Sequence, residues 1–244
     1  MRTLPRLSAL MITAMLSAAA TADQHGSGWS YSGNTGPDSW GGACTEGSMQ
    51  SPIDLAYANT VGEIEVSIDY TNVPLNIANL GKTVQANFPA GLHMTTGGKV
   101  FNLIQVHFHT PSEHAISGEL MPLVAHFVHA TDEGALGVLG VMFEEGDANA
   151  ELQKIIDGAK TAGKEATMVE GVELVVADLV PEELDVYRYM GSLTTPPCSE
   201  GVNWHVVSDS MTASNRQISQ MERLMGMNAR PLLPVNNRLV VAPE

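Results

Sequence analysis

The segment QVHFHTPSEHAISGELMPLVAHFVH, residues 105–129, contains two apolar runs, and each run carries two histidines. His107 and His109 lie one residue apart in the first run, so a β-strand places both imidazoles on the same face. A connection rich in proline and glycine leads to the second run, LVAHFVH, which contains His126. A short connection favours antiparallel pairing, and such pairing brings His126 across from the first two histidines.

Three neutral imidazoles that converge on one point are the protein half of a catalytic zinc site, whose fourth position stays open to water. The alternative is a set of core histidines, because a buried histidine is usually a hydrogen-bonded structural residue. Each would then need its own partner in a largely apolar layer, where an unpartnered polar group is costly. The pattern therefore favours a metal site, and the rest of the chain must indicate its chemistry.

The 244 residues are enough for one large domain or two small ones. No long linker, low-complexity tract or internal repeat interrupts them, so we predict a single domain over residues 23–244. Residues 1–22, MRTLPRLSALMITAMLSAAATA, combine two arginines, a short apolar stretch and small residues, the pattern of a signal peptide cleaved near Ala22. No stretch has the length and apolarity of a membrane span. Because of the signal peptide, we expect an exported protein, periplasmic or secreted.

Charge and cysteine content narrow the choice of partners and compartment. Removal of residues 1–22 would take away two arginines and change the net charge from −15 to −17. Such a charge disfavours nucleic acid and anionic membranes as partners. The only cysteines are Cys44 and Cys198, and an even count in an exported protein predicts a disulfide, with two free buried thiols as the alternative.

Strand patterns dominate the middle of the chain. Short alternating apolar runs separated by turn residues cover residues 63–109, and residues 135–143, ALGVLGVMF, suit a strand buried on both faces. Apolar spacing and capping residues predict helices beginning after Asp147 and at the Ser214–Gln217 capping box, the latter ending at Gly226. Pro181 predicts a short helical turn. We therefore expect a β-rich α+β fold with few peripheral helices.

Several short motifs follow one another along the chain beyond the predicted cleavage site. They are W-x-Y-x(4)-GP-x(2)-W from Trp29, QSPIDL from Gln50, IQVHFH-x(3)-EH from Ile104, AHFVH from Ala125, GVLGV from Gly137, SLTTPPCSEGVNW from Ser192, and NARP with NNR near the end. Together they resemble the α-class carbonic anhydrases, specifically the exported bacterial type. The resemblance covers essentially the whole chain after residue 22, and its specificity comes from the combination of motifs.

The resemblance implies a central, mostly antiparallel twisted sheet of about ten strands, and a zinc-dependent lyase that reversibly hydrates CO2 to bicarbonate and a proton. It implies Zn²⁺ held by His107, His109 and His126. Zinc-bound hydroxide would attack CO2, oriented by the hydroxyl of Thr194, which in turn donates its proton to Glu113, an acceptor-only carboxylate when ionised. Without the family, Thr194 is simply a turn hydroxyl and Glu113 a loop carboxylate.

The resemblance also implies roles around the metal. Gln105 matches the residue that holds a ligand imidazole, and Thr195 matches a bicarbonate contact. The positions that would line an apolar CO2 pocket, which are otherwise ordinary core residues, are Val128, Val138, Leu193, Val202 and Trp204.

Further implications concern covalent structure, assembly and the other histidines. Cys44 and Cys198 fall where exported bacterial members have their disulfide, and Ser51-Pro52 and Pro196-Pro197 fall where the family has cis peptide bonds. Members of this kind are often dimers, so a homodimer is an expectation, although no surface pattern in the sequence indicates one. We expect the remaining histidines to be structural, surface or packing residues, namely His25, His93, His114, His129 and His205.

Two positions depart from the family pattern. Val124 stands where a glutamate usually accepts the outer N–H of the third ligand, and losing such a partner typically costs about 10–100-fold in metal affinity or activity. Lys82 stands where many members have a proton-shuttling histidine. A solvated turn residue is the alternative interpretation of Lys82, and we favour it over a catalytic role.

Two rival functions remain to be compared. A cupin-like metalloenzyme shares the spacing H-x-H-x(3)-E, but the glycines and the later histidine motif of that family are missing. A non-catalytic carbonic-anhydrase-like module, which binds a partner or stores zinc, would be expected to lack a zinc ligand, and this chain has all three. Metal content and CO2 hydration by the purified protein distinguish the three hypotheses.

Overall fold

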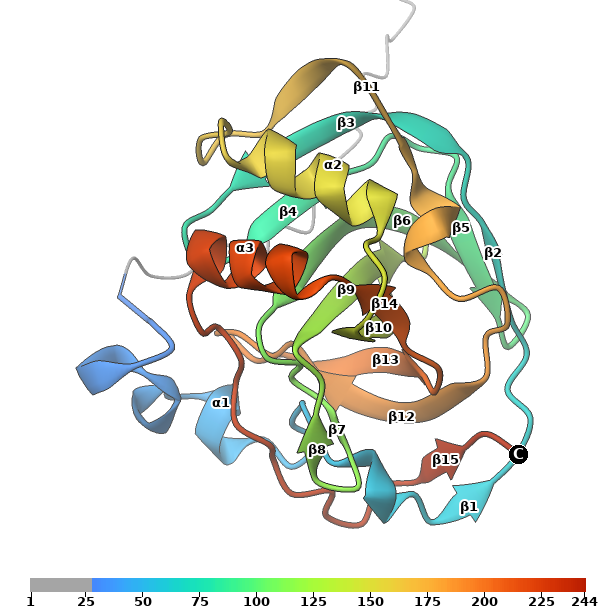
Figure 1. The fold of residues 1–244 in the computed structure, drawn as a ribbon. Helices are drawn as coiled ribbons and strands as arrows, with labels where there is room; N and C mark the ends of the chain where they lie inside the picture. Colours follow the sequence, from blue (N-terminus) through green and yellow to red (C-terminus); the bar gives the residue numbers. More distant parts are fainter. Residues whose placement is uncertain (1–27) are drawn as a thin grey trace, which may run out of the picture.

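A mixed β-sheet of thirteen strands forms the centre of the computed structural model, which describes residues 28–244 (Figure 1). The predicted signal peptide, residues 1–22, lies outside the described residues. Ten strands follow one hydrogen-bonded path, in the order β1-β15-β12-β13-β10-β9-β6-β4-β3-β11, and β2, β5 and β14 pair beside it. The predicted β-rich α+β class and the sheet of about ten strands are confirmed.

The pairing between neighbouring strands is antiparallel except where β1 meets β15 and where β10 meets β13 and β14. A separate hairpin is formed by β7 (Ala115–Ile116) and β8 (Glu119–Leu120). The strands of the large sheet are β1 (Thr60–Val61), β2 (Val66–Asp69), β3 (Asn72–Asn79), β4 (Val84–Asn87), β5 (His93–Thr96), β6 (Lys99–His109), β9 (Leu123–Ala130), β10 (Leu136–Glu145), β11 (Thr167–Val175), β12 (Val186–Ser192), β13 (Glu200–Val207), β14 (Met211–Ala213) and β15 (Val240–Ala242).

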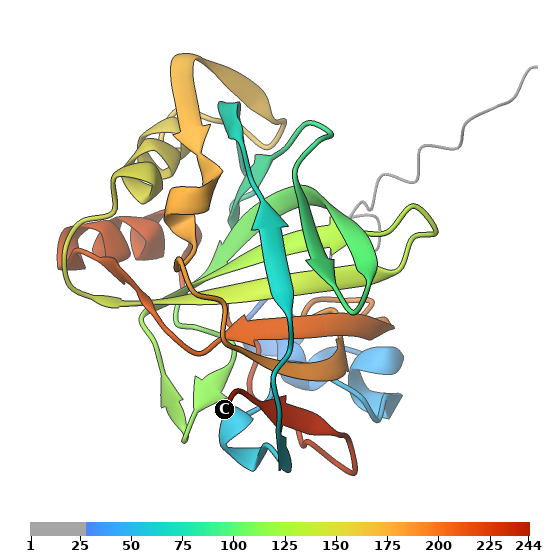
Figure 2. The ribbon, with the colours of Figure 1, turned by 90° about the vertical axis from the view of Figure 1, so that its right-hand side faces the viewer.

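Helices are few and lie beside the sheet. The α-helices are α1 (Ala43–Glu46), α2 (Ala150–Ala159) and α3 (Asn215–Met225), and the 3₁₀ turns are η1 (Gly33–Thr35), η2 (Pro37–Ser39), η3 (Leu55–Tyr57) and η4 (Val176–Leu179). Figure 2 shows α2 and α3 on the same side of the sheet. No helix within residues 28–244 is long and apolar enough to cross a membrane.

The helix boundaries confirm one prediction and correct two. The capping box of Ser214 and Gln217 begins α3, and the helix ends at Gly226 as expected. The N-cap of α2 is Asn149 rather than Asp147, because the Asn149 side chain accepts the backbone N–H of Leu152. The expected helical turn at Pro181 is wrong: η4 precedes this residue, and the chain that follows it enters β12.

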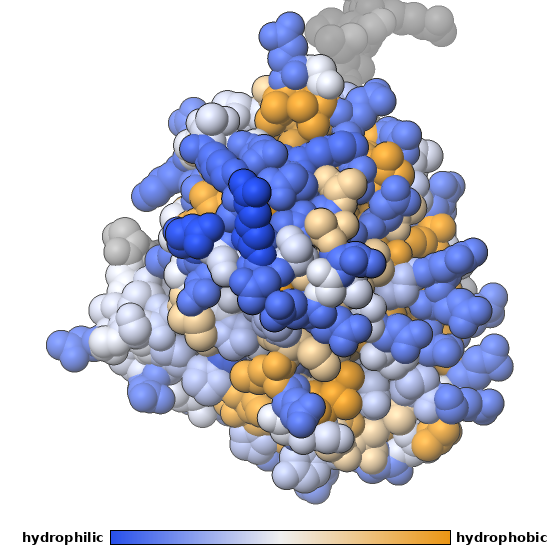
Figure 3. All heavy atoms as spheres, in the orientation of Figure 1, coloured by the Kyte–Doolittle hydropathy of each residue, from blue (hydrophilic) through white to orange (hydrophobic). Residues whose placement is uncertain are grey.

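The central strands separate two buried layers. On one face, phenylalanines of β6, β9 and β10 pack with apolar residues of α2 and α3, and full burial of each such side chain contributes on the order of 1.5–3 kcal/mol. The other face carries a smaller apolar cluster that includes Val128, Val138 and Trp204. The histidines of the first motif belong to this second face. Outside these layers, the side seen in Figure 3 is mostly hydrophilic, in keeping with the many acidic residues.

Candidate metal centre

Strand pairing brings the three predicted ligands together. His107 and His109 alternate with Phe108 on β6, so both point to the same face of the sheet. β9 pairs antiparallel with β6, and its His126 lies directly opposite His107. One nitrogen from each imidazole can be chosen so that all three lie within 4.8 Å of one another. The geometry is that of three ligands around one ion.

Two of the imidazoles have partners that fix their tautomers. Nδ1 of His107 lies 2.9 Å from Oε1 of Gln105, and Nδ1 of His109 lies 2.7 Å from the backbone oxygen of Asn228. An oxygen acceptor requires a proton on each Nδ1, which leaves each Nε2 as an electron-pair donor. Nε2 of His109 is buried and has no hydrogen-bond partner among the described residues, as a metal-binding atom would be. These residues therefore fit a metal ion.

Burial keeps two of the three imidazoles, His107 and His126, neutral. Desolvation lowers the pKa of His107 well below its ordinary value, and the neighbouring His109 lowers it further. The pKa of His126 is lowered in the same way, by burial first and then by the surrounding histidines. A neutral imidazole is the form that binds metals, so at neutral pH no proton has to be displaced from these two ligands.

The third predicted ligand, His126, lacks the hydrogen-bond acceptor that His107 and His109 each have. Nε2 of His126 is buried and has no hydrogen-bond partner among the described residues. Val124 lies two residues earlier on β9, so it shares the face of His126, and its side chain is fully buried. Binding of a metal through either nitrogen of His126 leaves the other as an N–H donor, and Val124 offers it no acceptor.

A buried carboxylate, Glu113, lies beside the histidines. Its Oε1 accepts the backbone N–H of Arg230 at 2.9 Å, and its oxygens lie 3.5 Å and 3.8 Å from Nδ1 of His109 and His126. Burial raises the pKa of Glu113 above its ordinary value, while His109, the backbone N–H and charge of Arg230, and the hydroxyl of Thr194 lower it. Thr194 therefore lies close enough to interact with Glu113, although Oε2 has no hydrogen bond of regular geometry within residues 28–244.

The predicted pocket residues share the histidine face. Val138 on β10 lies opposite Val128 on β9 and beside Trp204 on β13, so three apolar side chains form a row across three strands. Leu193 and Val202 belong to the same apolar cluster. Thr195 follows Thr194 in residues 193–199, which connect β12 to β13.

A model of the eukaryotic-type carbonic anhydrase family matches residues 35–244, which is most of the chain. The chain belongs to this α-class carbonic anhydrase family. A carbonic anhydrase of Pectobacterium carotovorum is 38% identical over 240 residues, which span 96% of this chain and 97% of that protein. One from Neisseria gonorrhoeae is 35% identical over 249 residues, 98% of each chain. The solved α-carbonic anhydrase of Photobacterium profundum is 42% identical with a TM-score of 0.82, covering 87% of this chain and 99% of that one.

Family membership confirms the resemblance read from the motifs. The protein is a carbonic anhydrase, a lyase that acts on carbon dioxide and bicarbonate. Membership in this family supports CO2 hydration as its activity. α-Carbonic anhydrases are metalloenzymes, which agrees with a histidine triad that could hold a metal. The predicted disulfide between Cys44 and Cys198 is present, as are the two expected cis peptide bonds and a third, Thr110-Pro111.

The structure corrects the interpretation of Lys82. This residue is not a solvated turn lysine: its ammonium donates to the backbone oxygen of Trp29 and lies 3.6 Å from the centre of the Trp29 ring. Two of the other histidines, His114 and His129, are hydrogen-bonded in the core as predicted, whereas His25 lies outside the described residues. Nε2 of His114 lies 2.6 Å from the hydroxyl of Tyr189, and Nε2 of His129 lies 2.7 Å from that of Tyr70.

Sequence reasoning missed two residues of the NARP motif that support the carbonic anhydrase site. Asn228 accepts from His109 through its backbone oxygen, and its side chain accepts the N–H of Thr110 and donates to the backbone oxygen of Phe108. Arg230 holds Glu113 through its own backbone N–H. The motif is part of the resemblance, but nothing in its composition indicates contact with residues more than 100 positions earlier.

Proposed function

We propose that the protein catalyses the reversible hydration of carbon dioxide to bicarbonate and a proton, with Zn²⁺ held by His107, His109 and His126. The observation that carries the proposal is the convergence of these three imidazoles on the apolar-lined face of the sheet in a carbonic anhydrase chain. Three histidine ligands with an open fourth position are the arrangement of a catalytic zinc rather than a structural one.

Zinc bound there would supply a hydroxide nucleophile at neutral pH, because it lowers the pKa of coordinated water to about 7, for which carbonic anhydrases are the standard example. The chain's contribution is to hold the ligands in one tautomer and orientation. Gln105 and the backbone oxygen of Asn228 do this for His107 and His109.

Thr194 and Glu113 would orient the nucleophile. The Thr194 hydroxyl can accept a hydrogen bond from the attacking oxygen only when its own proton is donated to another group. Glu113 is the acceptor in this proposal, and the interaction of the two side chains supports it. The backbone N–H and the charge of Arg230 both favour the ionised carboxylate, which is the form able to accept.

The substrate would lie against the row of Val128, Val138 and Trp204. Carbon dioxide carries no charge and forms weak hydrogen bonds, so an apolar wall holds it without competing for the polar groups. In the same proposal Leu193 and Val202 complete this wall, and Thr195 contacts bicarbonate, the charged product.

The proton formed in each cycle must leave the site by another route than Lys82. A lysine is protonated at neutral pH, and here the ammonium already donates to Trp29, so it has no capacity to accept a proton. We propose that buffer collects the proton. Residues 23–244 would act as one exported domain in the periplasm or outside the cell, and assembly as a homodimer stays a prediction.

The experiment is stopped-flow measurement of CO2 hydration by the purified protein, combined with metal analysis. The proposal expects about one zinc per chain and hydration that disappears on chelation. Zinc without hydration would support a storage or binding module instead. A different metal with no hydration would support another metalloenzyme class, such as the cupin-like one.

A further inference from the structure

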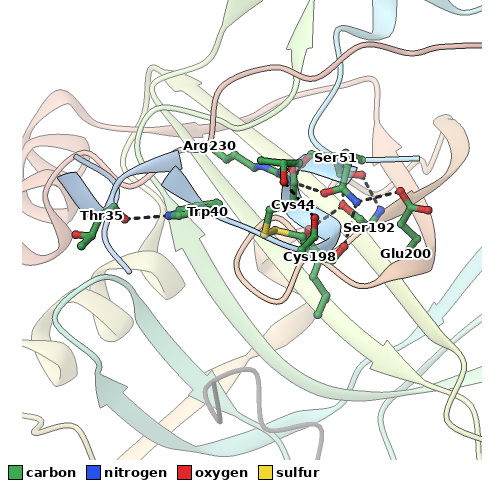
Figure 4. Close-up of a disulfide and its surroundings, with 12 residues drawn as sticks. Thr35, Trp40, Cys44, Ser51, Ser192, Cys198, Glu200 and Arg230 are labelled. Carbon is green, nitrogen blue, oxygen red and sulfur yellow. Dashed lines mark hydrogen bonds between the residues drawn. A yellow bond between two sulfur atoms is a disulfide. The ribbon is translucent and has the colours of Figure 1, made fainter. Parts of the chain in front are cut away.

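Thr194 and Glu113, the proposed orienting pair, come from parts of the chain about 80 residues apart, so something must set their relative position. Residues 193–199, which contain Thr194, are held at both ends by the segment of residues 44–51 (Figure 4). At one end, Cys198 is bonded to Cys44, and its backbone oxygen accepts from Nε2 of Gln50 at 3.1 Å.

At the other end of residues 193–199, a reciprocal pair of hydrogen bonds joins the same segment to β12. The backbone N–H of Ser51 donates to Oγ of Ser192 at 2.9 Å, and the backbone N–H of Ser192 donates to Oγ of Ser51 at 3.0 Å. All of these atoms lie in buried residues. Segment 44–51 therefore holds the chain on both sides of Thr194, at Ser192 and at Cys198.

The same segment reaches Glu113 through Arg230. The guanidinium of Arg230 donates from Nη2 to the backbone oxygen of Cys44 at 2.8 Å, and from Nη1 to Oε1 of Gln50 at 2.9 Å and the backbone oxygen of Ser51 at 2.7 Å. Its backbone N–H then donates to Glu113. Arg230 is only 4% exposed as a residue, so these bonds are shielded from water.

A guanidinium suits this task because its donors form a rigid planar fork. Three bonds from one fork to three residues of one segment fix both the distance and the orientation of the guanidinium, and the side chain fixes the backbone that bears it. The ring of Trp40 lies 5.6 Å from Cζ of Arg230 and completes its surroundings.

We propose that Arg230 is a positioning residue, whose guanidinium couples the disulfide-bonded segment 44–51 to the N–H that holds Glu113. One segment then sets Thr194 and Glu113 relative to each other. The inference rests on the proposed function, because it concerns groups that are proposed to orient the nucleophile. It does not require Arg230 to touch zinc or substrate.

The chain offers a matched control in Arg238. This arginine is 8% exposed, donates to the backbone oxygens of Pro234, Val235 and Met190, and lies 5.4 Å from the ring of Tyr189. It therefore shares the burial and the bonding type of Arg230. None of these three acceptors belongs to segment 44–51 or to the proposed orienting pair.

The test is a double-mutant cycle on kcat/KM for CO2 hydration, with zinc content measured on every protein. Its corners are the wild type, Arg230→Ala, the pair Cys44→Ala with Cys198→Ala, and the combination of all three substitutions. We expect Arg230→Ala to keep about one zinc per chain and to lower kcat/KM about tenfold or more, with a smaller loss in kcat if proton release limits it. The combined variant should lose at least about fivefold less than the product of the separate losses, because both changes break the same connection.

The parallel cycle with Arg238→Ala should be multiplicative, and Arg238→Ala alone should keep kcat/KM within about twofold. Equal kcat/KM in Arg230→Ala and wild type, or a multiplicative Arg230 cycle, overturns the inference. An inactive wild type would instead overturn the proposed function, so the two failures are distinguishable.

A milder variant covers the case in which Arg230→Ala does not fold. Gln50→Leu removes the side-chain bonds of Gln50 to Arg230, Cys198 and Glu200 while leaving those three residues in place. The inference expects a few-fold loss of kcat/KM at full zinc content in the folded protein. Unchanged kcat/KM in folded, zinc-loaded Gln50→Leu would count against it.

Discussion

Strand β9 carries a buried histidine on each of its two faces, and the two behave differently. His126 points to the face where His107 and His109 converge, and its Nε2 has no hydrogen-bond partner among the described residues. His129 points to the phenylalanine-rich core, where its Nε2 is 2.7 Å from the hydroxyl of Tyr70. Burial lowers the pKa of both, that of His129 to about 3.

Burial and a lowered pKa therefore do not distinguish a metal ligand from a structural histidine in this molecule. The difference lies in what the imidazole faces. On the core face a phenol pairs with Nε2 of His129, and the buried Nδ1 of His129 has no partner among the described residues. On the other face three rings meet, and one nitrogen of each lies within 4.8 Å of the others. A metal ion is the partner that satisfies all three at once.

The largest expected effect comes from replacing the two histidines of β9 one at a time. His126→Ala should reduce bound zinc from about one per chain to below about a tenth and abolish measurable hydration, because two imidazoles hold zinc poorly. His129→Gln should keep both zinc and kcat/KM. Metal analysis and stopped-flow assays of the two variants side by side check this, and a fully zinc-loaded, active His126→Ala would remove His126 from the ligand set.

The second prediction concerns acid stability and the core face. His129 has a folded-state pKa of about 3 against an ordinary value near 6.5, so between these values the unfolded chain binds a proton that the folded chain does not. The stability from neutral His129 is complete above about pH 6.5 and is lost as pH falls, by up to about 1.4 kcal/mol per pH unit.

At pH 7 the His129→Gln protein should have a modestly lower free energy of unfolding than wild type. As pH is lowered from 7 to 5, this difference should shrink, because only the wild type loses the stability that neutral His129 provides. Urea unfolding at several pH values measures this, with His93→Gln at a partly exposed site as the control. Parallel stability curves for His129→Gln and wild type would show that His129 does not titrate on unfolding.

The third prediction concerns the missing partner of His126. A carboxylate at position 124 would share the face of His126 and could accept its outer N–H, whereas valine cannot. Val124→Glu should slow chelator-driven zinc loss by about 10–100-fold relative to wild type. Val124→Leu, which stays apolar, should release zinc as fast as wild type, and equal rates for all three proteins would contradict this account of the position.

The smallest expected effect is on proton release. Lys82→His replaces an ammonium that donates to the backbone oxygen of Trp29 by an imidazole, whose ordinary pKa suits proton transfer near neutrality. In weak buffer kcat should rise a few-fold while kcat/KM stays within about twofold, and imidazole-type buffers should raise the wild-type kcat in a saturable way. Lys99→His, at an exposed position, is the control. A kcat unaffected by buffer and by Lys82→His would place proton transfer on another group.

The local part of the site could be predicted from sequence because strand periodicity is local. Alternation placed His107 and His109 on one face, and the short connection placed His126 opposite them. The Ser214 capping box succeeded for the same reason, since both of its partners lie within four residues. The N-cap of α2 failed by two residues because Asp147 and Asn149 are both good caps, and only packing chooses between them.

The long-range part could not be read from the sequence. The contacts of Asn228 with His109 and of Arg230 with Glu113 join the end of the chain to its middle, and no local pattern encodes such a contact. Lys82 was misjudged for the same reason, because the ring that binds it comes from the N-terminal arm. The family resemblance predicts roles for residues near the metal, but the hydrogen bonds that hold these residues could be identified only from the structure.

The most direct measurement is a zinc titration of the metal-free protein, followed by its rate of CO2 hydration. Zinc removed with a chelator would be returned in steps, and the rate recorded at each ratio of zinc to chain. The account predicts a rate near zero without zinc, a linear rise, and a sharp break at about one equivalent, since a triad of histidines forms one site. Hydration that persists in the metal-free protein, or a rate that does not respond to zinc, would contradict it.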